Sequence, residues 1–385
     1  MPWENVVMLI QYKHCVAVMI AGGLLSTAYA QENQATIHQL QALSYGDDPG
    51  VQYVVLNRDS VLFEHSVGWA DVKKKIPLRL NHTMASFSMT KTLTAIAVLQ
   101  LVEANKIKLD DVLSTYVAHP YSSDVTIRHL LNHTSGIPNP IPLRWVHLVT
   151  DHDEFDGDQA LNQVLKDYPD QDNPAGEHYN YSNIGYWLLG ELIQNVSKQS
   201  YAAYVTEHIF KPLNLSSKDI GFTINTPNHA KGYLKKWSFM NVFGRFFIDT
   251  HVLGEYEGSW LHIRNVYVNG AAFGGVVGTP KAFAKILQDF LGDQSKLLGL
   301  QGKAMLHSQQ TTNDGNTIPM TLGWHVGLLK GEKFFYKEGG GAGFHSEMRI
   351  YPKSNIASVI MTNRTSLNSR AILSALDEHY IGVQP

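Results

Sequence analysis

The chain has 385 residues, of which 44% are hydrophobic and 17% charged, and its formal net charge is −3 at pH 7. This length and composition suit one large domain, or two closely packed lobes, with a substantial core. The near-neutral balance and the lack of a basic arm argue against nucleic acid as a partner. The 18 histidines form neither an HExxH motif nor Cys/His pairs, so no metal site is expected.

The N-terminus is typical of an export signal. Lys13 precedes an apolar segment over 15–25, and Ala28-Tyr29-Ala30 offers a small-x-small cleavage site. The apolar run is too short for an ordinary membrane span, and an uncleaved interfacial anchor is the alternative. Cys15 is the only cysteine, so the mature chain would have neither a disulfide nor a catalytic thiol. The predicted location is therefore periplasmic or secreted.

The first half of the mature chain mixes strands with helices. A polar helix over 31–45 is followed by strands over 51–57 and 61–69, joined by a turn. Apolar residues at helical spacing predict a helix from Phe87 to about residue 103. Further helices or helical turns are predicted over 107–118, 126–133, 158–167 and 184–212.

The second half ends in an antiparallel meander. Residues 221–278 are less regular and rich in aromatic residues, and the part over 237–260 could form an acyl-pocket wall, a membrane-touching patch or a packed loop. A helix is predicted over 280–291. Strands are then predicted over 320–329, 332–338, 344–352 and 356–363, with a glycine turn over 339–343, before a last helix over 367–380.

This order of elements predicts an α/β fold of the α+β type. One antiparallel β-sheet would be built from both chain ends and flanked by helices, with an inserted mostly helical lobe. We expect a signal peptide over 1–30 and one domain over 31–385. Its sheet lobe would comprise about residues 31–85 and 275–385, and its helical lobe about residues 86–274. A site would fall at the seam between the lobes, where pockets commonly lie.

Residues 86–103 carry the first pattern with catalytic chemistry. A helix that begins near Phe87 would place Ser88 and Lys91 one turn apart on the same face. Nucleophilic catalysis needs such a pair, because a serine hydroxyl is weak until a neighbouring base or cation activates it. The helix N-terminus would add N–H groups and partial positive charge near an oxyanion. A capped, solvated first turn is the alternative interpretation.

Tyr181 and Asn183 form a second pattern, immediately before a predicted helix. A phenol titrates at about 10 in water, and adjacent ammonium groups can lower its pKa. A phenolate flanked by lysines could take the Ser88 proton and pass it to a leaving group. Asn183 offers both a donor and an acceptor, suited to holding Lys91 and a substrate carbonyl. A helix-capping turn with a packed tyrosine is the alternative.

A third pattern lies in the stretch Tyr-Lys-Glu-Gly-Gly-Gly-Ala-Gly over 336–343. Lys337 supplies a cation, and Gly339 and Gly340 would let a substrate lie against exposed backbone N–H groups. A flexible glycine hairpin is the alternative.

Together these stretches resemble the three motifs of the serine β-lactamase and penicillin-binding-protein superfamily. In chain order they are Ser88-Met-Thr-Lys91, Tyr181-Ser-Asn183 and Lys337-Glu-Gly339. The tyrosine is similar to that of the class C-like branch, which also holds D-alanyl-D-alanine carboxypeptidases, D-aminopeptidases and family VIII esterases. Supporting segments such as His133-Thr-Ser-Gly136 match too, and the resemblance covers about residues 35–380.

The resemblance implies a β-lactamase/transpeptidase-like fold and a role for each motif residue. Ser88 would be the acylated nucleophile, with Lys91 and Tyr181 as its activating base network. Asn183 would orient the substrate, and Lys337 would tune Tyr181 or hold an anionic group. The family needs neither a metal nor a cofactor.

The third motif departs from the β-lactamase pattern. The resemblance places the oxyanion hole at the N–H groups of Ser88 and Gly340, with Gly339 and the residue before it close to the substrate. In β-lactamases the residue between the lysine and the glycine of this motif is usually threonine or serine, but here it is Glu338. A carboxylate would repel the anionic group of a penicillin or a D-Ala-D-Ala terminus, unless it faces away from Lys337 along the strand.

This departure favours an exported serine hydrolase of esterase or amidase type that works through an acyl-enzyme. The alternative is a β-lactamase or a D-alanyl-D-alanine carboxypeptidase. A catalytically silent binding protein on the same fold is a minor alternative. Such relatives usually lose part of the catalytic set, whereas all five motif residues named above are present here. The expected partner is a small-molecule ester, amide or β-lactam, or a peptidoglycan peptide, and a membrane contact is a further alternative.

Overall fold

The computed structural model describes residues 32–142, 144–238, 249–365 and 367–382. The predicted export signal lies outside these ranges. So do four aromatic residues of the predicted aromatic segment, Phe239, Phe243, Phe246 and Phe247.

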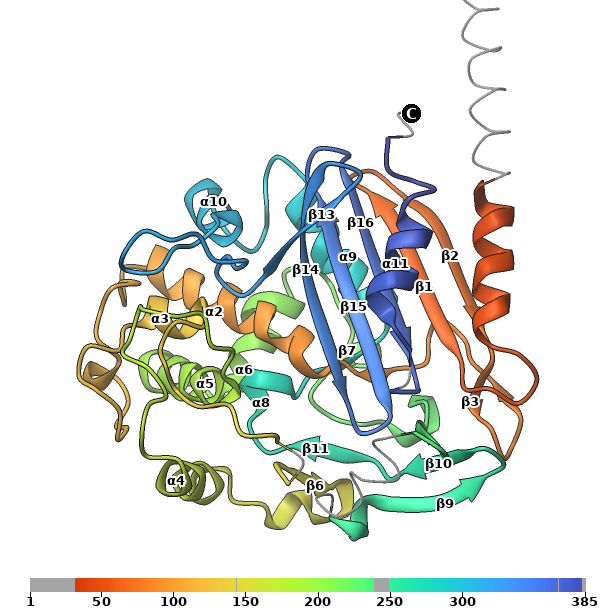
Figure 1. Ribbon diagram of the computed structural model, residues 1–385, viewed down its shortest axis with the longest axis horizontal. Coiled ribbons are helices and arrows are strands. Elements are labelled where there is room, and N and C mark those ends of the chain that lie inside the picture. The colour runs from red at the N-terminus through yellow and green to blue at the C-terminus, as the bar shows by residue number, and fades with distance from the viewer. Residues whose placement is uncertain (1–31, 143, 239–248, 366, 383–385) are drawn as a thin grey trace, which may run out of the picture.

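A six-stranded antiparallel sheet joins the two ends of the chain (Figure 1), in the order β13-β14-β15-β16-β1-β2. Val51 lies opposite Thr362, and Asn57 lies opposite Ile356. The paired strands β1 and β16 are buried on both faces, which explains why their sequences are almost continuously apolar. The strands are β1 (Val51–Asn57), β2 (Val61–Val67), β13 (His325–Leu329), β14 (Glu332–Gly341), β15 (Phe344–Tyr351) and β16 (Ile356–Thr362).

Helices cover both faces of this sheet. On one face, a helix over residues 32–43 and α11 (Ser369–Asp377) bury Leu40 and Leu373 in one core. On the other face, α9 (Pro280–Leu291) packs against β1, β15 and β16. The prediction of a sheet built from both chain ends and flanked by helices is therefore confirmed.

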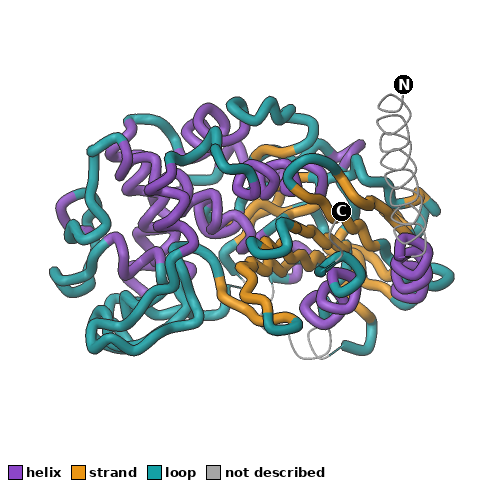
Figure 2. The backbone as a smooth tube through the Cα atoms, turned by 90° about the horizontal axis from the view of Figure 1, so that it is seen from above, coloured by secondary structure: helices purple, strands orange, loops and turns teal. Residues whose placement is uncertain are grey.

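Most other helices gather at the opposite end of the molecule from the large sheet (Figure 2). At their centre α2 (Thr90–Glu103) contacts α5, α6, α8 and α10 and is buried on nearly every side. The α-helices of this part are α3 (Ile127–Leu131), α4 (Gly157–Asp167), α5 (Asn183–Ser197), α6 (Tyr201–Val205), α8 (Ala271–Gly274) and α10 (Leu300–His307). Shorter helical turns are η1 (Phe87–Met89), η2 (Leu113–Thr115), η3 (Val149–Glu154), η4 (Thr206–Phe210), η5 (Thr226–Asn228) and η7 (Thr250–Val252).

The region over 221–278 is more regular than its sequence indicated. Among the described residues, two of its three small sheets are completed by a strand from elsewhere in the chain, which local periodicity could not identify, whereas the third is formed within the region. They consist of β8 (Gly232–Lys235), β10 (Trp260–Ile263) and β9 (Leu253–Glu257); β11 (Val266–Val268) and β6 (Val146–Leu148); and β5 (Met84–Ala85), β12 (Val277–Gly278) and β7 (Ile220–Gly221). A further pair, β3 (Trp69–Asp71) and β4 (Ile76–Pro77), follows β2.

Two other features differ from the sequence expectation. The helix α10 was not expected, and the predicted turn over 339–343 begins too early. Gly339–Gly341 continue β14 opposite β15, and only Ala342 and Gly343 form the turn. Glycine favours turns in isolation, but here the partner strand supplies the hydrogen bonds that extend the ladder.

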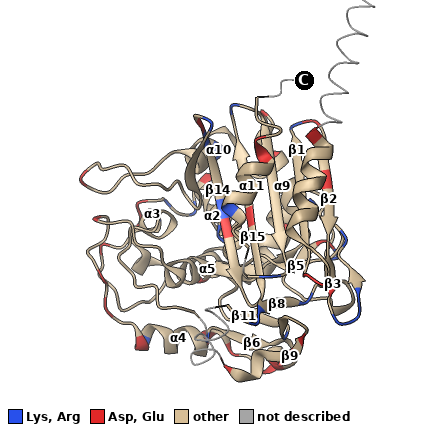
Figure 3. Cartoon of the chain, turned by 45° about the vertical axis from the view of Figure 1, so that its right-hand side comes forward, with Lys and Arg blue, Asp and Glu red and all other residues tan. Residues whose placement is uncertain are grey.

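Charged residues of both signs are scattered over the molecule, as Figure 3 shows. In the part of the chain that the structure describes, no helix has the length and apolar character that a bilayer crossing requires. The same residues include no group of three or more His, Cys, Asp or Glu side chains placed to hold a metal ion.

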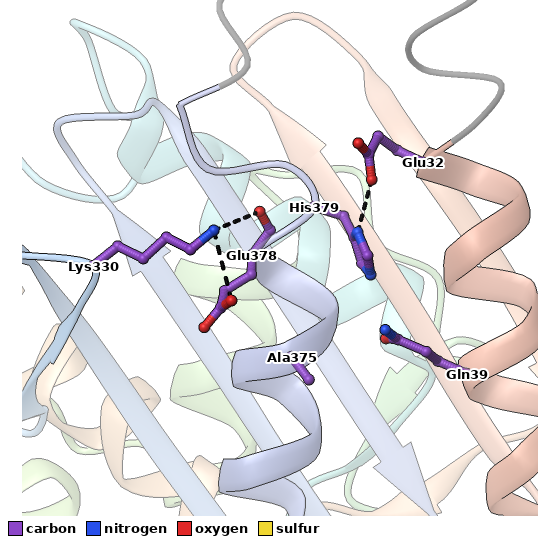
Figure 4. A pocket seen from close by; sticks show the side chains of 6 residues that line it. All are labelled: Glu32, Gln39, Lys330, Ala375, Glu378 and His379. Atoms are coloured by element: carbon purple, nitrogen blue, oxygen red, sulfur yellow. Dashed lines mark hydrogen bonds and ion pairs between the residues drawn. The ribbon is translucent and has the colours of Figure 1, made fainter.

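A polar pocket separates the N-terminal helix from α11 (Figure 4). Glu32 accepts a hydrogen bond from His379 at 2.7 Å, and Lys330 lies 3.6 Å from the Glu378 carboxylate. The first contact ties the N-terminal helix to the segment after α11, and the second ties that segment to the turn between β13 and β14.

A buried ionic network anchors α11 to the sheet. Arg349 Nε donates to Glu347 at 2.6 Å, and Arg349 Nη1 lies 3.8 Å from Asp377, with all three side chains fully buried. Asp377 also accepts hydrogen bonds from Tyr53 at 3.0 Å and Tyr351 at 2.7 Å. The network places two carboxylates around one guanidinium, so the charge of Arg349 is needed to balance them.

We expect Arg349→Ala to lower the free energy of unfolding by about 3–5 kcal/mol, because it leaves two buried carboxylates without their cation. Urea unfolding followed by circular dichroism measures this loss. Arg58→Ala is the matched control, since its side chain is 46% exposed and its ion pairs lie on the surface; a change within about 1 kcal/mol is expected there. Equal losses in the two variants would contradict the role given to the network.

Candidate active site

Ser88 occupies a strained turn at the entrance to α2. It lies in the middle of η1, and the preceding residue, Phe87, has φ of 44°, a left-handed conformation that a phenylalanine seldom adopts. Such strain persists only where surrounding contacts enforce it, and it is common at functional sites. Ser88 is partly exposed whereas Phe87 and Met89 are buried, so the turn presents the hydroxyl outward.

Lys91 follows one turn later and is fully buried. Its Nζ lies 3.1 Å from Ser88 Oγ, 2.7 Å from Asn183 Oδ1 and 2.7 Å from the backbone oxygen of Phe273. Burial lowers the pKa of Lys91 well below its usual value, and the charge of Lys337 lowers it further. A neutral amine has two N–H donors and one lone pair, which matches two fixed acceptors and one hydroxyl.

Asn183 and Tyr181 are held by the start of α5. The Ser182 hydroxyl caps this helix by accepting from the N–H of Gly185 at 3.0 Å. Asn139 Oδ1 accepts from the Asn183 N–H at 3.1 Å. The prediction of a helix directly after this motif is confirmed, and the cap determines the direction in which Asn183 meets Lys91.

Tyr181 lies between the two lysines of the site. The centroid of its ring is 5.0 Å from Lys91 Nζ and 4.9 Å from Lys337 Nζ. The imidazole of His133 packs on the same ring at 4.2 Å, and the ring of His325 stacks on it at 6.2 Å. The Tyr181 hydroxyl is hydrogen-bonded to Ser88. Tyr181 is therefore enclosed by side chains from four separate stretches of the chain.

The protonation state expected for Tyr181 needs correction. The sequence suggested a phenolate whose pKa the lysines lower, but burial raises the pKa of Tyr181 well above its usual value, and the Ser88 hydrogen bond opposes this only in part. The reason is that the same burial also lowers the pKa values of both lysines, which reduces the positive charge around the ring. At neutral pH Tyr181 is a phenol.

Lys337 is the second buried amine of the site. Burial lowers its pKa to about 7, which the charge of Glu338 opposes. Its Nζ has no hydrogen-bond partner among the described residues, although the atom is buried. An unsatisfied buried donor is costly in a folded protein, so Lys337 is ready to bind a polar group that enters the site.

The glycines of β14 allow this strand to lie against the nucleophile turn. A Cβ on Gly339 would come within 2.0 Å of the Ser86 backbone oxygen and 3.0 Å of the Ser88 nitrogen. The neighbouring strand β13 pairs with β14 only as far as Tyr336. From residue 337 onward the outer edge of β14 has no strand partner among the described residues, and Gly340 is exposed there.

Glu338 points away from Lys337, as alternation along a strand requires. Its carboxylate lies 2.8 Å from His345 Nε2 and 3.1 Å from Arg370 Nη2. The hydrogen bond with His345 is the main cause that lowers the pKa of Glu338, so the group is ionised. Because a cationic guanidinium accompanies it, the repulsion of anionic substrates expected from the sequence is reduced.

The structure thus brings together Ser88, Lys91, Tyr181, Asn183 and Lys337 and places Glu338 on the other side of β14. The role of the Phe273 carbonyl could not be predicted, because a backbone oxygen has no residue signature. It also did not single out His325, whose proximity to Tyr181 depends on the pairing of β13 with β14. His133 could have been noticed, since it lies in a segment that matches the family.

Comparisons with known proteins assign the chain to a family. The sequence profile of the Beta-lactamase family matches residues 35–379, and the chain belongs to this family of serine hydrolases. Protein flp of Staphylococcus aureus (strain MW2) is 27% identical over 339 residues, which cover 86% of this chain and 62% of that protein. This chain therefore spans less than two thirds of the length of that relative.

Solved structures share the fold. A D-amino acid amidase from Ochrobactrum anthropi SV3 matches with a TM-score of 0.71 and 18% identity, over 92% of this chain and 98% of that one. A β-lactamase/D-alanine carboxypeptidase from Yersinia pestis matches with a TM-score of 0.69 and 20% identity, over 94% of this chain and 99% of that one. The β-lactamase/transpeptidase-like fold expected from the motifs is therefore confirmed.

Proposed function

We propose that this protein is an exported serine hydrolase that cleaves an ester or related amide through an acyl-enzyme on Ser88. The observation that carries the proposal is the contact set of Lys91. Its amine lies 3.1 Å from Ser88 Oγ while Asn183 and the Phe273 carbonyl take up its two N–H groups. The remaining lone pair is then directed to the hydroxyl whose proton must be removed.

The proposed proton path starts from Ser88, which contacts both Lys91 and Tyr181. In acylation, Ser88 attacks the substrate carbonyl and gives its proton to the neutral amine of Lys91. The Tyr181 phenol donates its proton to the departing alkoxide or amine, and the proton held by Lys91 returns to Tyr181. In deacylation, water attacks the acyl-enzyme and gives one proton back to Ser88, so the site is restored.

The oxyanion would be stabilised by backbone groups. The N–H of Ser88 stands at the start of η1 and α2, and the N–H of Gly340 belongs to the exposed edge of β14. Gly339 permits the close approach that puts these two segments side by side. Donors held in this way need no reorganisation as charge develops on the substrate oxygen.

A β-lactamase or D-alanyl-D-alanine carboxypeptidase is the second candidate. The observation in its favour is that Arg370 lies 3.1 Å from the Glu338 carboxylate and is 59% exposed, so an anionic substrate would meet a cation as well as an anion. The name of one structural relative, a β-lactamase/D-alanine carboxypeptidase, points in the same direction, whereas that of the D-amino acid amidase fits the ester or amide proposal.

A side-by-side assay separates the two candidates. The mature protein is incubated with p-nitrophenyl acetate and with a chromogenic cephalosporin, and the acyl adduct is sought by mass spectrometry on the peptide that contains Ser88. Ester turnover with little cephalosporin hydrolysis would support the esterase proposal. Faster cephalosporin hydrolysis would make the second candidate correct, and an unmodified Ser88 with both substrates would contradict the acyl-enzyme.

Export is proposed from the apolar segment over 15–25 and the Ala28-Tyr29-Ala30 site. Expression of the full chain in a Gram-negative host, followed by osmotic release and N-terminal sequencing, tests it. A periplasmic product that begins near Gln31 is expected, whereas an unprocessed cytoplasmic product would contradict export.

The charge of Lys337 gives the activity a predictable pH dependence. A general base works only above its own pKa, so the acid limb of kcat/KM reports the pKa of Lys91. Because the Lys337 charge is one of the two causes that lower this pKa, Lys337→Met should raise it and move the acid limb to higher pH. The pH profile of p-nitrophenyl acetate hydrolysis measures the shift. Lys333→Met, an exposed position on the same strand, should leave it unchanged; a shift to lower pH in Lys337→Met would contradict the assignment of Lys91 as the base.

A further inference from the structure

We propose that an apolar cavity beside Ser88 binds the acyl chain of the substrate, so that the protein prefers esters or amides of uncharged, medium-length acyl groups. This inference rests on the proposed function. The cavity has a volume of about 370 Å³. Phe87, Gly340 and Gly341 are among its lining residues, and they lie beside the nucleophile and at the proposed oxyanion hole.

The chemistry of the walls selects an apolar ligand. Aliphatic side chains from β8, β10 and β11 form much of the lining, among them Leu234, Ile263 and Val266, all nearly buried. The other walls include Trp145 and Phe273. Among the described residues, no Asp, Glu, Lys or Arg side chain lines the cavity, and the polar side chains in its wall are those of His345 and Thr365. A charged or strongly hydrated group would lose its water there without gaining a partner.

The position of the cavity assigns it to the acyl side of the scissile bond. A leaving group must lie near the phenol that protonates it, but neither Tyr181 nor either active-site lysine lines the cavity. The cavity instead opens beside Gly340, whose N–H would hold the carbonyl oxygen. A carbonyl bound to Ser88 with its oxygen at that N–H would direct its acyl substituent past Phe87 into the cavity.

One wall of the cavity depends on a close contact between a glycine and an aromatic ring. A Cβ on Gly341 would lie 2.7 Å from the Phe87 ring, so the glycine lets this ring rest against β14. The sequence had suggested that aromatic residues over 237–260 shape such a pocket. Among the described residues of that segment, the one that lines the cavity is the aliphatic Val252, whereas Trp237 is 83% exposed.

Two ester series test the proposal. One varies the acyl chain of p-nitrophenyl esters from acetate to dodecanoate, and the other varies the alcohol chain of acetate esters. We expect kcat/KM to rise about fourfold per methylene along the acyl series until the cavity is full, which corresponds to burying one methylene at a time. The alcohol series should stay nearly flat. A flat acyl series with hydrolysis that still requires Ser88, or a rise that follows the alcohol chain, would overturn the cavity assignment while leaving the serine hydrolase intact.

A variant at the rim gives a second, fold-safe test. Ile141 lines the cavity but is 79% exposed, so Ile141→Asp puts a carboxylate at the rim without disturbing the core. It should lower the ratio of octanoate to acetate turnover at least about tenfold. Leu328→Asp, at an equally exposed site on β13, is the matched control and should leave the ratio unchanged. Equal ratios in the two variants would overturn the proposal.

Binding can be measured even if no ester is cleaved. Calorimetric titration of hexanoate and decanoate into the Ser88→Ala protein measures binding to the cavity in a variant that lacks the proposed nucleophile. Tighter binding of decanoate that Ile141→Asp weakens would support the acyl site, and absence of decanoate binding would overturn it. Loss of the proposed function is recognised separately, by a wild-type Ser88 that forms no acyl adduct.

Discussion

Ser88→Ala is expected to reduce the turnover of every acyl substrate by at least about 10⁴-fold, because it removes the hydroxyl that we propose to form the acyl-enzyme. The hydroxyl is partly exposed at the strained η1 turn and is contacted by Lys91 at 3.1 Å. No other described residue combines an accessible hydroxyl with a buried amine in contact with it. The measurement is kcat/KM for the best ester substrate, with intact-protein mass spectrometry to show that no adduct forms.

The variant should fold normally, since alanine fits wherever serine does and the turn is held by its neighbours. Ser60→Ala, in the exposed turn after β1, is the matched control and should keep full activity. Residual turnover within about tenfold of the wild type would mean that another nucleophile acts, and the acyl-enzyme on Ser88 would have to be abandoned.

Lys91→Met is expected to lower kcat by about 10³–10⁴-fold, because it removes the proposed general base while keeping a side chain of similar length. Asn183 Oδ1 and the Phe273 carbonyl would lose their donor, which should cost about 1–3 kcal/mol of stability. Acylation rates from rapid mixing, together with urea unfolding, separate the catalytic loss from the structural one. Lys106→Met, at an exposed position just beyond α2, serves as control and should change neither.

Lys91→Arg distinguishes a base from a mere positive charge. A guanidinium remains protonated throughout the working pH range, so it cannot accept the Ser88 proton. If Lys91 is the base, the arginine variant should be as inactive as the methionine variant. Substantial activity in Lys91→Arg would show that the site needs a cation at this position and would transfer the role of base to Tyr181.

Local sequence determined much of the fold. The strands β1, β15 and β16 and the helices α2, α5 and α9 have apolar patterns strong enough to indicate their type before any tertiary contact is known. The motif residues Ser88, Lys91, Tyr181, Asn183 and Lys337 were also identifiable, because the spacing within each motif follows from local structure, namely a helical turn, the cap of a helix and a strand.

Tertiary structure decided the chemistry of these residues. The sequence allowed Tyr181 to be a phenolate, but its enclosure by His133, His325 and two lysines favours the phenol, since burial disfavours charge on every group at once. Similarly, Glu338 could be judged only once α11 had brought Arg370 to it. Arg370 lies 32 residues from Glu338 along the chain, so no local pattern could indicate their contact.

The cavity beside Ser88 is the clearest case of a feature that only the fold could create. Its walls come from segments as distant as Phe87, Ile141, Val252 and His345, and none of these residues has a local pattern that marks a binding site. The residues of a motif are specified by short-range geometry, so the sequence by itself determined which groups are the candidates for the reaction. The space that a substrate occupies and the proton affinity of each group depend on how distant segments exclude water, and these were decided by the packed tertiary structure alone.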